Sequence, residues 1–164
     1  GMKKLIVLLL IPLFSFSQTY KDVMSINSLD TFKKVAIENN YEYSDIEQEG
    51  LVTYGYNISK DDDGNKSSSK WAYYIPKDDM FVFSFTRGNA MSEFFGTELD
   101  NSENPYDLIL KDVKDKCNYY KIVNHEGTDF VTYSCPESSY KGKLGFVIKN
   151  VDYQTGIIMH FPNE

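Results

Sequence analysis

Cysteine, histidine and tryptophan are scarce in this chain, whose 164 residues include two Cys, two His and one Trp. Two cysteines are too few for a disulfide-dense miniprotein. Hydrophobic residues make up 41% of the chain and charged residues 25%, a balance that excludes a disordered, collagen-like or coiled-coil protein. Aromatic residues are abundant in contrast, with 13 Tyr and 11 Phe. The composition therefore predicts a folded domain with many aromatic side chains in its core.

Sequence motifs for catalysis and metal binding are missing as well. The acidic run that begins at Asp61 would place Gly64 at the sixth position of an EF-hand, but Lys70 then stands where a bidentate Glu is required. Neither His125 nor His160 has a Cys or His at zinc-ligand spacing. The sequence also lacks a Gly-x-Ser-x-Gly elbow and a glycine-rich phosphate loop. We therefore expect no metal, no cofactor and no catalytic residue, and we interpret the acidic run as a hairpin loop.

Clusters of basic residues are also absent. The chain carries 17 basic and 24 acidic residues, for a formal net charge of −7. Binding to nucleic acid depends on neutralising phosphates with Lys and Arg, and binding to anionic membranes depends on the same residues. We therefore expect neither partner.

Residues 1–17 have the layout of a secretory signal peptide. Lysines at positions 3 and 4 precede an apolar run over residues 5–14, and residues 15–17 supply small side chains for cleavage before Gln18. The apolar run is about half as long as a membrane span requires. Gly1 is typical of a residue left by an expression tag, and Gln directly after a Ser-rich end is similar to exported proteins of the Bacteroidetes group. We expect a periplasmic or secreted protein without a membrane span in its mature form.

The sequence also indicates an internal repeat, because the chain aligns with itself when its second half is placed on its first. The matched positions keep the order of expected elements, and they include Asn27 on Asn104, Tyr43 on Tyr120, Glu49-Gly50 on Glu126-Gly127, and Val52-Thr53-Tyr54 on Val131-Thr132-Tyr133. We infer a duplication, with a first repeat over residues 18–86, a linker over 87–103 and a second repeat over 104–164.

Each predicted repeat begins with a helix. Asn27 or Ser28 can cap the first helix, and Asn104 can cap the second, with Pro105 at its first position. Apolar residues at helical spacing then give each helix one buried face. Those residues are Leu29, Phe32, Val35 and Ala36 in the first helix, and Tyr106, Ile109, Leu110, Val113 and Cys117 in the second.

Four strands are expected after each helix, near residues 41–47, 51–57, 70–76 and 81–86, and near 118–124, 129–135, 143–149 and 156–161. Because side chains alternate along a strand, we assign one set to the core under the helices. That set comprises Trp71, Tyr73, Ile75, Phe81, Phe83, Phe85, Leu144, Phe146, Ile148, Ile157, Met159 and Phe161. The fold class is therefore α+β, with two tandem helix-plus-four-strand units forming one extended sheet and the helices on one face.

The two cysteines are expected to form a disulfide. A three-residue loop at 125–127 would pair Asn124 with Thr128 in a hairpin and place Cys117 opposite Cys135. Directly opposite residues have the Cβ separation that a disulfide requires. The sequence has no Cys-x-x-Cys spacing, so we interpret the pair as structural rather than redox-active.

This architecture resembles the β-lactamase-inhibitor-protein fold. The likeness rests on an exported chain with tandem units, each a helix followed by a four-stranded antiparallel sheet, and on a disulfide that joins a helix end to a strand. It covers most of residues 18–164 and concerns architecture alone, so it transfers no inhibitory residue. Asn40 aligns with Cys117, which means that the first unit lacks the cysteine pair.

We predict a non-enzymatic binding module that uses the sheet face opposite the helices. Its partner would be a protein or a cell-envelope component, and inhibition is one form that this binding could take. The predicted contact residues are Thr53, Tyr74, Ser84, Thr132, Val147 and His160, together with loop 61–69. The alternative is a small-ligand carrier or enzyme with a pocket between the sheet and linker 87–103.

Overall fold

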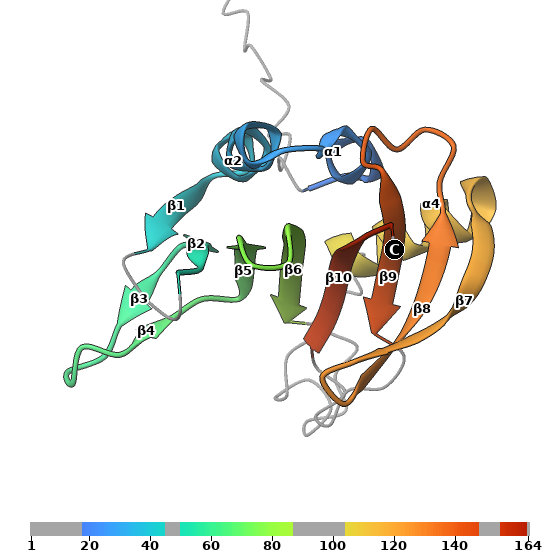
Figure 1. Cartoon of the computed structure of the whole chain (residues 1–164). Coiled ribbons are helices and arrows are strands. Elements are labelled where there is room, and N and C mark those ends of the chain that lie inside the picture. The colour runs from blue at the N-terminus through green and yellow to red at the C-terminus, as the bar shows by residue number, and fades with distance from the viewer. Residues whose placement is uncertain (1–17, 45–49, 87–103, 148–154, 164) are drawn as a thin grey trace, which may run out of the picture.

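The computed structural model describes residues 18–44, 50–86, 104–147 and 155–163, which form an α+β fold (Figure 1). The predicted signal peptide at 1–17 and the predicted linker at 87–103 lie outside the described residues. The helices are α1 (Tyr20–Ser25), α2 (Leu29–Glu38) and α4 (Pro105–Lys116). The strands are β1 (Tyr41–Ser44), β2 (Val52–Tyr56), β3 (Ser59–Lys60), β4 (Lys66–Ser67), β5 (Lys70–Ile75), β6 (Met80–Thr86), β7 (Asn118–His125), β8 (Thr128–Ser134), β9 (Gly142–Val147) and β10 (Thr155–Pro162).

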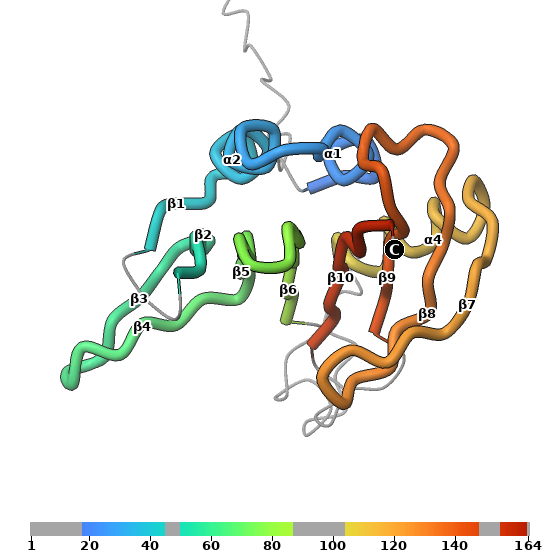
Figure 2. Tube along the Cα trace, in the orientation of Figure 1, coloured from blue at the N-terminus to red at the C-terminus, as the bar shows by residue number. Residues whose placement is uncertain are grey.

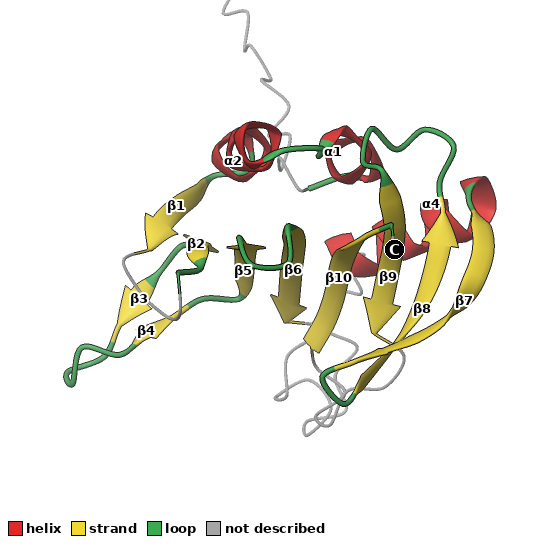
Figure 3. Ribbon diagram, in the orientation of Figure 1, coloured by secondary structure: helices red, strands yellow, loops and turns green. Residues whose placement is uncertain are grey.

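Eight of these strands form one antiparallel sheet in the order β1-β2-β5-β6-β10-β9-β8-β7. Strands β6 and β10 pair at its centre, and β1 and β7 are its edges. Figure 3 shows these strands in a row from β1 to β7, with α1 and α2 above them in this view. Strands β3 and β4 form a separate two-stranded hairpin, which projects from the β1–β2 side of the molecule (Figure 2).

The helix starts follow the capping residues predicted from the sequence. Ser28 caps α2, and its side chain forms a reciprocal capping box with Thr31. Asn104 caps α4 by accepting a hydrogen bond from the amide of Tyr106, with Pro105 at the first turn. Helix α1 was not expected from the sequence, because six residues are too few for an apolar repeat to stand out.

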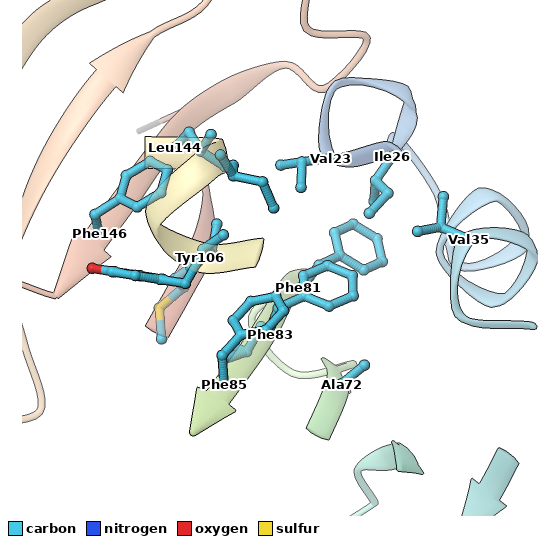
Figure 4. Packing of buried hydrophobic residues seen from close by; sticks show 14 of the residues in the cluster. Val23, Ile26, Val35, Ala72, Phe81, Phe83, Phe85, Tyr106, Leu144 and Phe146 are labelled. Atoms are coloured by element: carbon cyan, nitrogen blue, oxygen red, sulfur yellow. The ribbon is translucent and has the colours of Figure 1, made fainter. Parts of the chain in front are cut away.

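All three described helices pack against the same face of the sheet (Figure 4). On α2, the ring of Phe32 lies 5.4 Å from Phe81 and 5.6 Å from Phe83, between ring centroids. On α4, the ring of Tyr106 lies 6.3 Å from Phe85 and 5.8 Å from Phe146. Because the three Phe residues of β6 alternate along one strand, both helices cover one continuous aromatic core.

The predicted inward faces of β6 and of Leu144 and Phe146 in β9 are confirmed, whereas those of β5 and β10 are wrong by one residue. Ile148, the third predicted inward residue beside β9, lies outside the described residues. Ala72 of β5 pairs with Phe83, and Ile158 of β10 pairs with Phe83 from the other side, so Ala72 and Ile158 share the helix face. The residues assigned to the core under the helices in these two strands therefore point the other way. They are Trp71, Tyr73 and Ile75 in β5, and Ile157, Met159 and Phe161 in β10.

This error has a physical cause. Strand register decides which face a side chain occupies, and a shift of one residue moves every side chain to the other face. Strands β5 and β10 carry apolar residues on both faces, so hydrophobicity alone does not fix their orientation. The turn between β5 and β6 fixes it instead, by pairing Ile75 with Met80.

The Cys117–Cys135 disulfide is confirmed, although the hairpin that carries it differs from the prediction. His125 pairs with Thr128, so the turn consists of Glu126 and Gly127, both with positive φ, rather than three residues. This shorter turn displaces the register by one residue. A bulge between Tyr119 and Ile122 adds one residue to β7 and restores the register at the cysteines. The two differences cancel, which is why the pairing was predicted correctly.

Candidate functional site

The candidate site is the sheet face opposite the three described helices, which we call the distal face. Register places its central side chains on neighbouring strands: Trp71 pairs with Ser84, and Ser84 pairs with Ile157. Apolar residues dominate this face across the central strands. They are Trp71, Tyr73, Ile75, Met80, Val82, Ile157, Met159, Phe161, Val147, Phe130 and Val123.

Large aromatic side chains lie across glycines on the distal face. A Cβ atom on Gly55 would lie 2.8 Å from the Trp71 ring, and one on Gly145 would lie 2.3 Å from the Phe161 ring. Trp71 also stacks on Tyr73, with ring centroids 6.4 Å apart. All three rings remain partly exposed. The missing Cβ atoms let these rings lie close to the backbone, so they offer partly exposed aromatic contact surface. Five other apolar residues of this face are buried, namely Met80, Val82, Phe130, Val147 and Met159.

Two of the six predicted contact residues do not lie on the distal face. Tyr74 pairs with Phe81 and stacks on its ring at 5.1 Å, on the helix face. His160 also pairs with Phe81 and is 1% exposed. Both were placed on the distal face because the orientation of β5 and β10 was shifted by one residue. Their prediction as exposed contacts on the distal face is therefore wrong.

The other four predicted residues do lie on the distal face, but they differ in exposure. Thr53 is 3% exposed and Thr132 is 0% exposed, so neither offers its own side chain to a large partner. Val147 is 9% exposed, whereas Ser84 is partly exposed at the centre of the face. The structure thus brings Ser84 together with Trp71 and Ile157, two residues that sequence reasoning assigned to the core.

His160 is a component of the core between β10 and α1. Its Nε2 donates a hydrogen bond to the carbonyl of Val23 at 3.2 Å, and its ring meets those of Phe81 and Tyr140 edge-on. Burial lowers the pKa of His160 to about 4, because it disfavours the charged imidazolium. The backbone carbonyls of Val23 and Phe81 act in the opposite direction and raise this pKa, but burial is the larger effect. The neutral imidazole therefore connects α1 to the sheet through its hydrogen bond to Val23.

A cavity of about 200 Å³ lies at the β7 end of the distal face. Its described lining residues come from strands β7, β8, β9 and β10 and from the residue after β10, and they are Tyr120, Lys121, Val123, Thr132, Lys143, Phe161, Pro162 and Asn163. The Nζ atoms of Lys121 and Lys143 lie 5.3 Å and 4.8 Å from the centroid of the Tyr120 ring. Lys143 also donates a hydrogen bond to Oδ1 of Asn163 at 3.3 Å. The cavity combines two ammonium groups with aromatic walls.

The bulge in β7 shapes this cavity. Tyr119 and Ile122 both pair with helix-face residues of β8, so Tyr120 and Lys121 together stand opposite Thr132. The Thr132 hydroxyl donates to the Lys121 carbonyl at 2.6 Å and accepts from the Lys121 amide at 3.4 Å. The bulge thus turns two consecutive side chains to the distal face. Sequence reasoning missed these residues, although the adjacent Tyr119 and Tyr120 interrupt the alternation expected of a strand.

Loop 61–69 contains the turn of the β3–β4 hairpin, as its composition predicted. The carboxylate of Asp61 accepts hydrogen bonds from the amides of Asp63 and Asn65 and from the Asn65 side chain. The Asn65 side chain is the largest cause of the lowered pKa of Asp61. These hydrogen bonds give the carboxylate oxygens of Asp61 their partners within the turn.

Within the described residues, no group of three or more His, Cys, Asp or Glu side chains could hold a metal ion. No helix in that part of the chain is long and apolar enough to cross a membrane. Comparisons with protein-family models, curated proteins and solved structures gave no match to this chain.

Proposed function

We propose that the protein is an exported binding module that engages a protein or cell-envelope partner through the distal face. The observation that carries this proposal is the row of partly exposed apolar side chains formed by Trp71, Tyr73, Ile157 and Phe161. Contiguous apolar surface rimmed by polar residues is typical of protein-interaction sites. Aromatic side chains supply much of the energy at such sites because they bury large areas at little cost in side-chain entropy.

A tandem-repeat origin of the sheet is part of this proposal. Helix α2 precedes β1, β2, β5 and β6, and α4 precedes β7, β8, β9 and β10. Strands β1, β2, β5 and β6 form one half of the sheet and β10, β9, β8 and β7 form the other, and the halves meet where β6 pairs with β10. This arrangement supports the predicted duplication and the resemblance to the β-lactamase-inhibitor-protein fold. Under this proposal, fusion of two small sheets produced a platform wide enough for a protein partner.

Export is also a proposal, and it rests on the sequence of residues 1–17. The Cys117–Cys135 disulfide is compatible with a periplasmic or extracellular location, where disulfides form and persist. The net charge of −7 favours a partner that is neutral or basic over most of its surface. Inhibition of an enzyme is one form that such binding can take.

The test replaces the centre of the distal face with charge. Ser84→Arg and Ile157→Lys are combined, because both side chains are partly exposed and lie on neighbouring strands. The double variant should fold, as judged by circular dichroism and intact disulfide mass. We expect immobilised wild-type protein to capture a specific partner from envelope extract, and the double variant to lose that partner.

Leu108→Lys is the matched control, because Leu108 is 36% exposed on α4, on the other side of the molecule. This control variant should still capture the partner that the wild-type protein captures. If the double variant folds and captures the same partner as the wild type, the distal face is not the binding surface.

A further inference from the structure

We propose that Gln18 is a modification site: after export removes residues 1–17, its α-amine closes on its own side chain to form an N-terminal pyroglutamate, and the new ring stays buried beside Tyr41. This modification depends on the proposed export, because cleavage before Gln18 frees the amine. It goes beyond the proposed binding at the distal face, because Tyr41 pairs with Tyr56 on the helix side of the sheet. Its basis is the burial of the Gln18 side chain and the hydrogen bonding of its amide.

The side-chain amide of Gln18 is buried, but its two ends differ in their hydrogen bonding. Gln18 is 4% exposed, and its Oε1 accepts a hydrogen bond from the hydroxyl of Tyr41 at 3.4 Å. Its Nε2 is also buried, and among the described residues no group accepts a hydrogen bond from it. A buried donor without an acceptor destabilises the folded state, so the Gln18 amide calls for a chemical explanation.

Cyclisation removes this donor and keeps the acceptor. The unprotonated α-nitrogen of Gln18 attacks Cδ of the same residue, so that the N–Cδ bond forms and the Cδ–Nε2 bond breaks. Nε2 leaves as ammonia with the proton that the α-nitrogen gives up, and nothing is oxidised or reduced. Because the reaction is intramolecular, it needs no co-reactant. Oε1 becomes the carbonyl oxygen of the lactam ring and remains an acceptor for the hydroxyl of Tyr41.

The same reaction removes a charge from a buried position. Without cyclisation, cleavage would leave an α-ammonium group on a residue that is 4% exposed, and burying a charge costs far more than burying a neutral group. The carboxylate nearest in the sequence, that of Asp22, already has partners. Its Oδ2 accepts hydrogen bonds from the amide and hydroxyl of Thr19 at 2.9 Å and 3.1 Å, and from the Asn39 side chain at 3.4 Å. A neutral lactam nitrogen therefore suits this position better than an ammonium group.

The neighbours of Gln18 hold it in a defined place. Tyr41, the first residue of β1, is 5% exposed, and its ring meets that of Tyr56 edge-on at 6.3 Å. Burial raises the pKa of Tyr41, so its hydroxyl keeps the proton that it donates to Gln18. Thr19, the next residue along the chain, caps α1 in a capping box with Asp22. Gln18 is thus held between the start of α1 and the start of β1.

The first measurement is the mass of the N-terminal peptide of the exported chain, isolated from the organism that produces it. Trypsin cleaves after Lys21, and we expect the peptide over residues 18–21 to be lighter than its unmodified sequence by about 17 Da, the mass of one ammonia. Stepwise N-terminal sequencing of the chain should be blocked. Treatment of the denatured chain with pyroglutamyl aminopeptidase should remove the block, and sequencing should then begin at Thr19.

Gln18→Asn is the matched control, because it keeps a side-chain amide but could cyclise only to a strained four-membered ring. This variant should keep its full mass and a free α-amine at residue 18. In the wild-type protein, a peptide over residues 18–21 with its full mass and a free α-amine would overturn the modification and leave the proposed export standing. A chain that begins at any other residue would overturn the proposed cleavage, and the modification would fail with it.

The second measurement tests whether the ring is buried beside Tyr41. Pyroglutamyl aminopeptidase should remove the ring from the folded protein at least about tenfold more slowly than from the tryptic peptide over residues 18–21, because a buried chain end is released only by local unfolding. Tyr41→Phe deletes the hydroxyl that bonds to the ring and should speed removal from the folded protein by about three- to tenfold. Tyr43→Phe is the control, because Tyr43 lies on the same strand and is 64% exposed. Equal rates for the folded protein and the peptide, or equal rates for the two variants, would overturn the position of the ring beside Tyr41.

Discussion

At the scale of single residues, the least expected feature is a histidine in the core. His160 was predicted as an exposed contact, yet it is 1% exposed and donates its Nε2 proton to the Val23 carbonyl of α1. A buried imidazole that stays neutral makes folding depend on pH. The unfolded chain binds a proton near the ordinary pKa of 6.5, whereas burial lowers the pKa in the folded protein to about 4.

The first prediction concerns this pH dependence. As the pH falls from 6.5 towards 4, the unfolded chain holds a proton that the folded protein lacks, so acidification favours unfolding. The stability that neutral His160 contributes is complete above pH 6.5, and about 3 kcal/mol of it should be lost by pH 4. His160→Gln removes this titration while keeping a polar group. Chemical denaturation across the pH range should therefore show a shallower loss of stability for the variant than for the wild type.

Direct titration of the imidazole provides the second measurement, which remains informative if the variant does not fold. The ring C–H signals of His160, followed by NMR in the wild-type protein, should show a midpoint well below 6.5. A midpoint at or above 6.5 would contradict the burial argument.

Thr132 gives the second prediction at this scale. Thr132→Val should destabilise the protein by about 1–3 kcal/mol, because it removes the buried hydroxyl that bonds to the amide and carbonyl of Lys121. Thr132→Ser keeps the hydroxyl and should cost less. Hydrogen exchange at the Lys121 amide should accelerate in the Val variant only. Equal exchange in both variants would show that the hydroxyl does not hold the bulge.

At the scale of elements, local sequence signals predicted more than long-range ones. The helix caps Ser28 and Asn104 act within a few residues, and the structure uses both. The eight long strands were also located from apolar alternation and turn residues, within a few residues at their ends. The bulge in β7 was not predicted and the face orientation of β5 and β10 was predicted wrongly, because both depend on which strands pair and in which register.

In the candidate site, too, local sequence signals predicted some residues correctly, whereas features that depend on long-range strand pairing were missed. Ser84 was placed on the correct face from alternation within β6, whose neighbours Phe83 and Phe85 are unmistakably core residues. Trp71 was missed, because a tryptophan in an apolar strand looks like core whichever way it points. The cavity is lined by residues of four strands, β7 to β10, so its lysines Lys121 and Lys143 could be found only from the three-dimensional arrangement.

The disulfide gives the third prediction, and it concerns the connection between two elements. Cys117 follows the last turn of α4 and Cys135 follows β8, with a sequence separation of 18. Replacing both cysteines with alanine should lower the free energy of unfolding by about 3 kcal/mol, because the unfolded chain regains the freedom of that loop. Denaturation of the double variant beside the oxidised wild type measures the difference. A loss below about 0.5 kcal/mol would mean that the reduced hairpin is already constrained in the unfolded chain.

At the scale of the whole molecule, the two halves of the sheet share one core. Helix α1, near the start of the chain, bonds through Val23 to His160 in β10 and through the Met24 carbonyl to the Ser139 amide. Tyr106 of α4 reaches across to Phe85 in β6. Elements from each half thus stabilise the other, and the β6–β10 pair joins them. We therefore expect the molecule to unfold as one cooperative unit.

Gly156 allows this expectation to be tested, because it lies in β10 opposite Phe85 and beneath the ring of Tyr106. A Cβ atom there would lie 2.5 Å from Cγ of Tyr106, so Gly156→Ala must displace the Tyr106 side chain or the α4 backbone that carries it. We expect it to destabilise the protein by about 1–3 kcal/mol. The chain contains one tryptophan, Trp71, which lies in β5 of the other half and reports that half by fluorescence.

In a cooperative molecule, Gly156→Ala should shift the fluorescence transition of Trp71 and the circular dichroism transition of the whole protein to the same denaturant concentration. A Trp71 transition that stays in place would show that the halves unfold separately and would contradict the shared core. Tyr106→Leu provides the matched background, since a smaller side chain above Gly156 should reduce the cost of the added methyl group. If Gly156→Ala destabilises the Tyr106→Leu protein as much as it destabilises the wild type, the added methyl group does not clash with the Tyr106 ring. The distal face spans both halves, so this coupling also determines whether that face is one rigid surface or two surfaces that move independently.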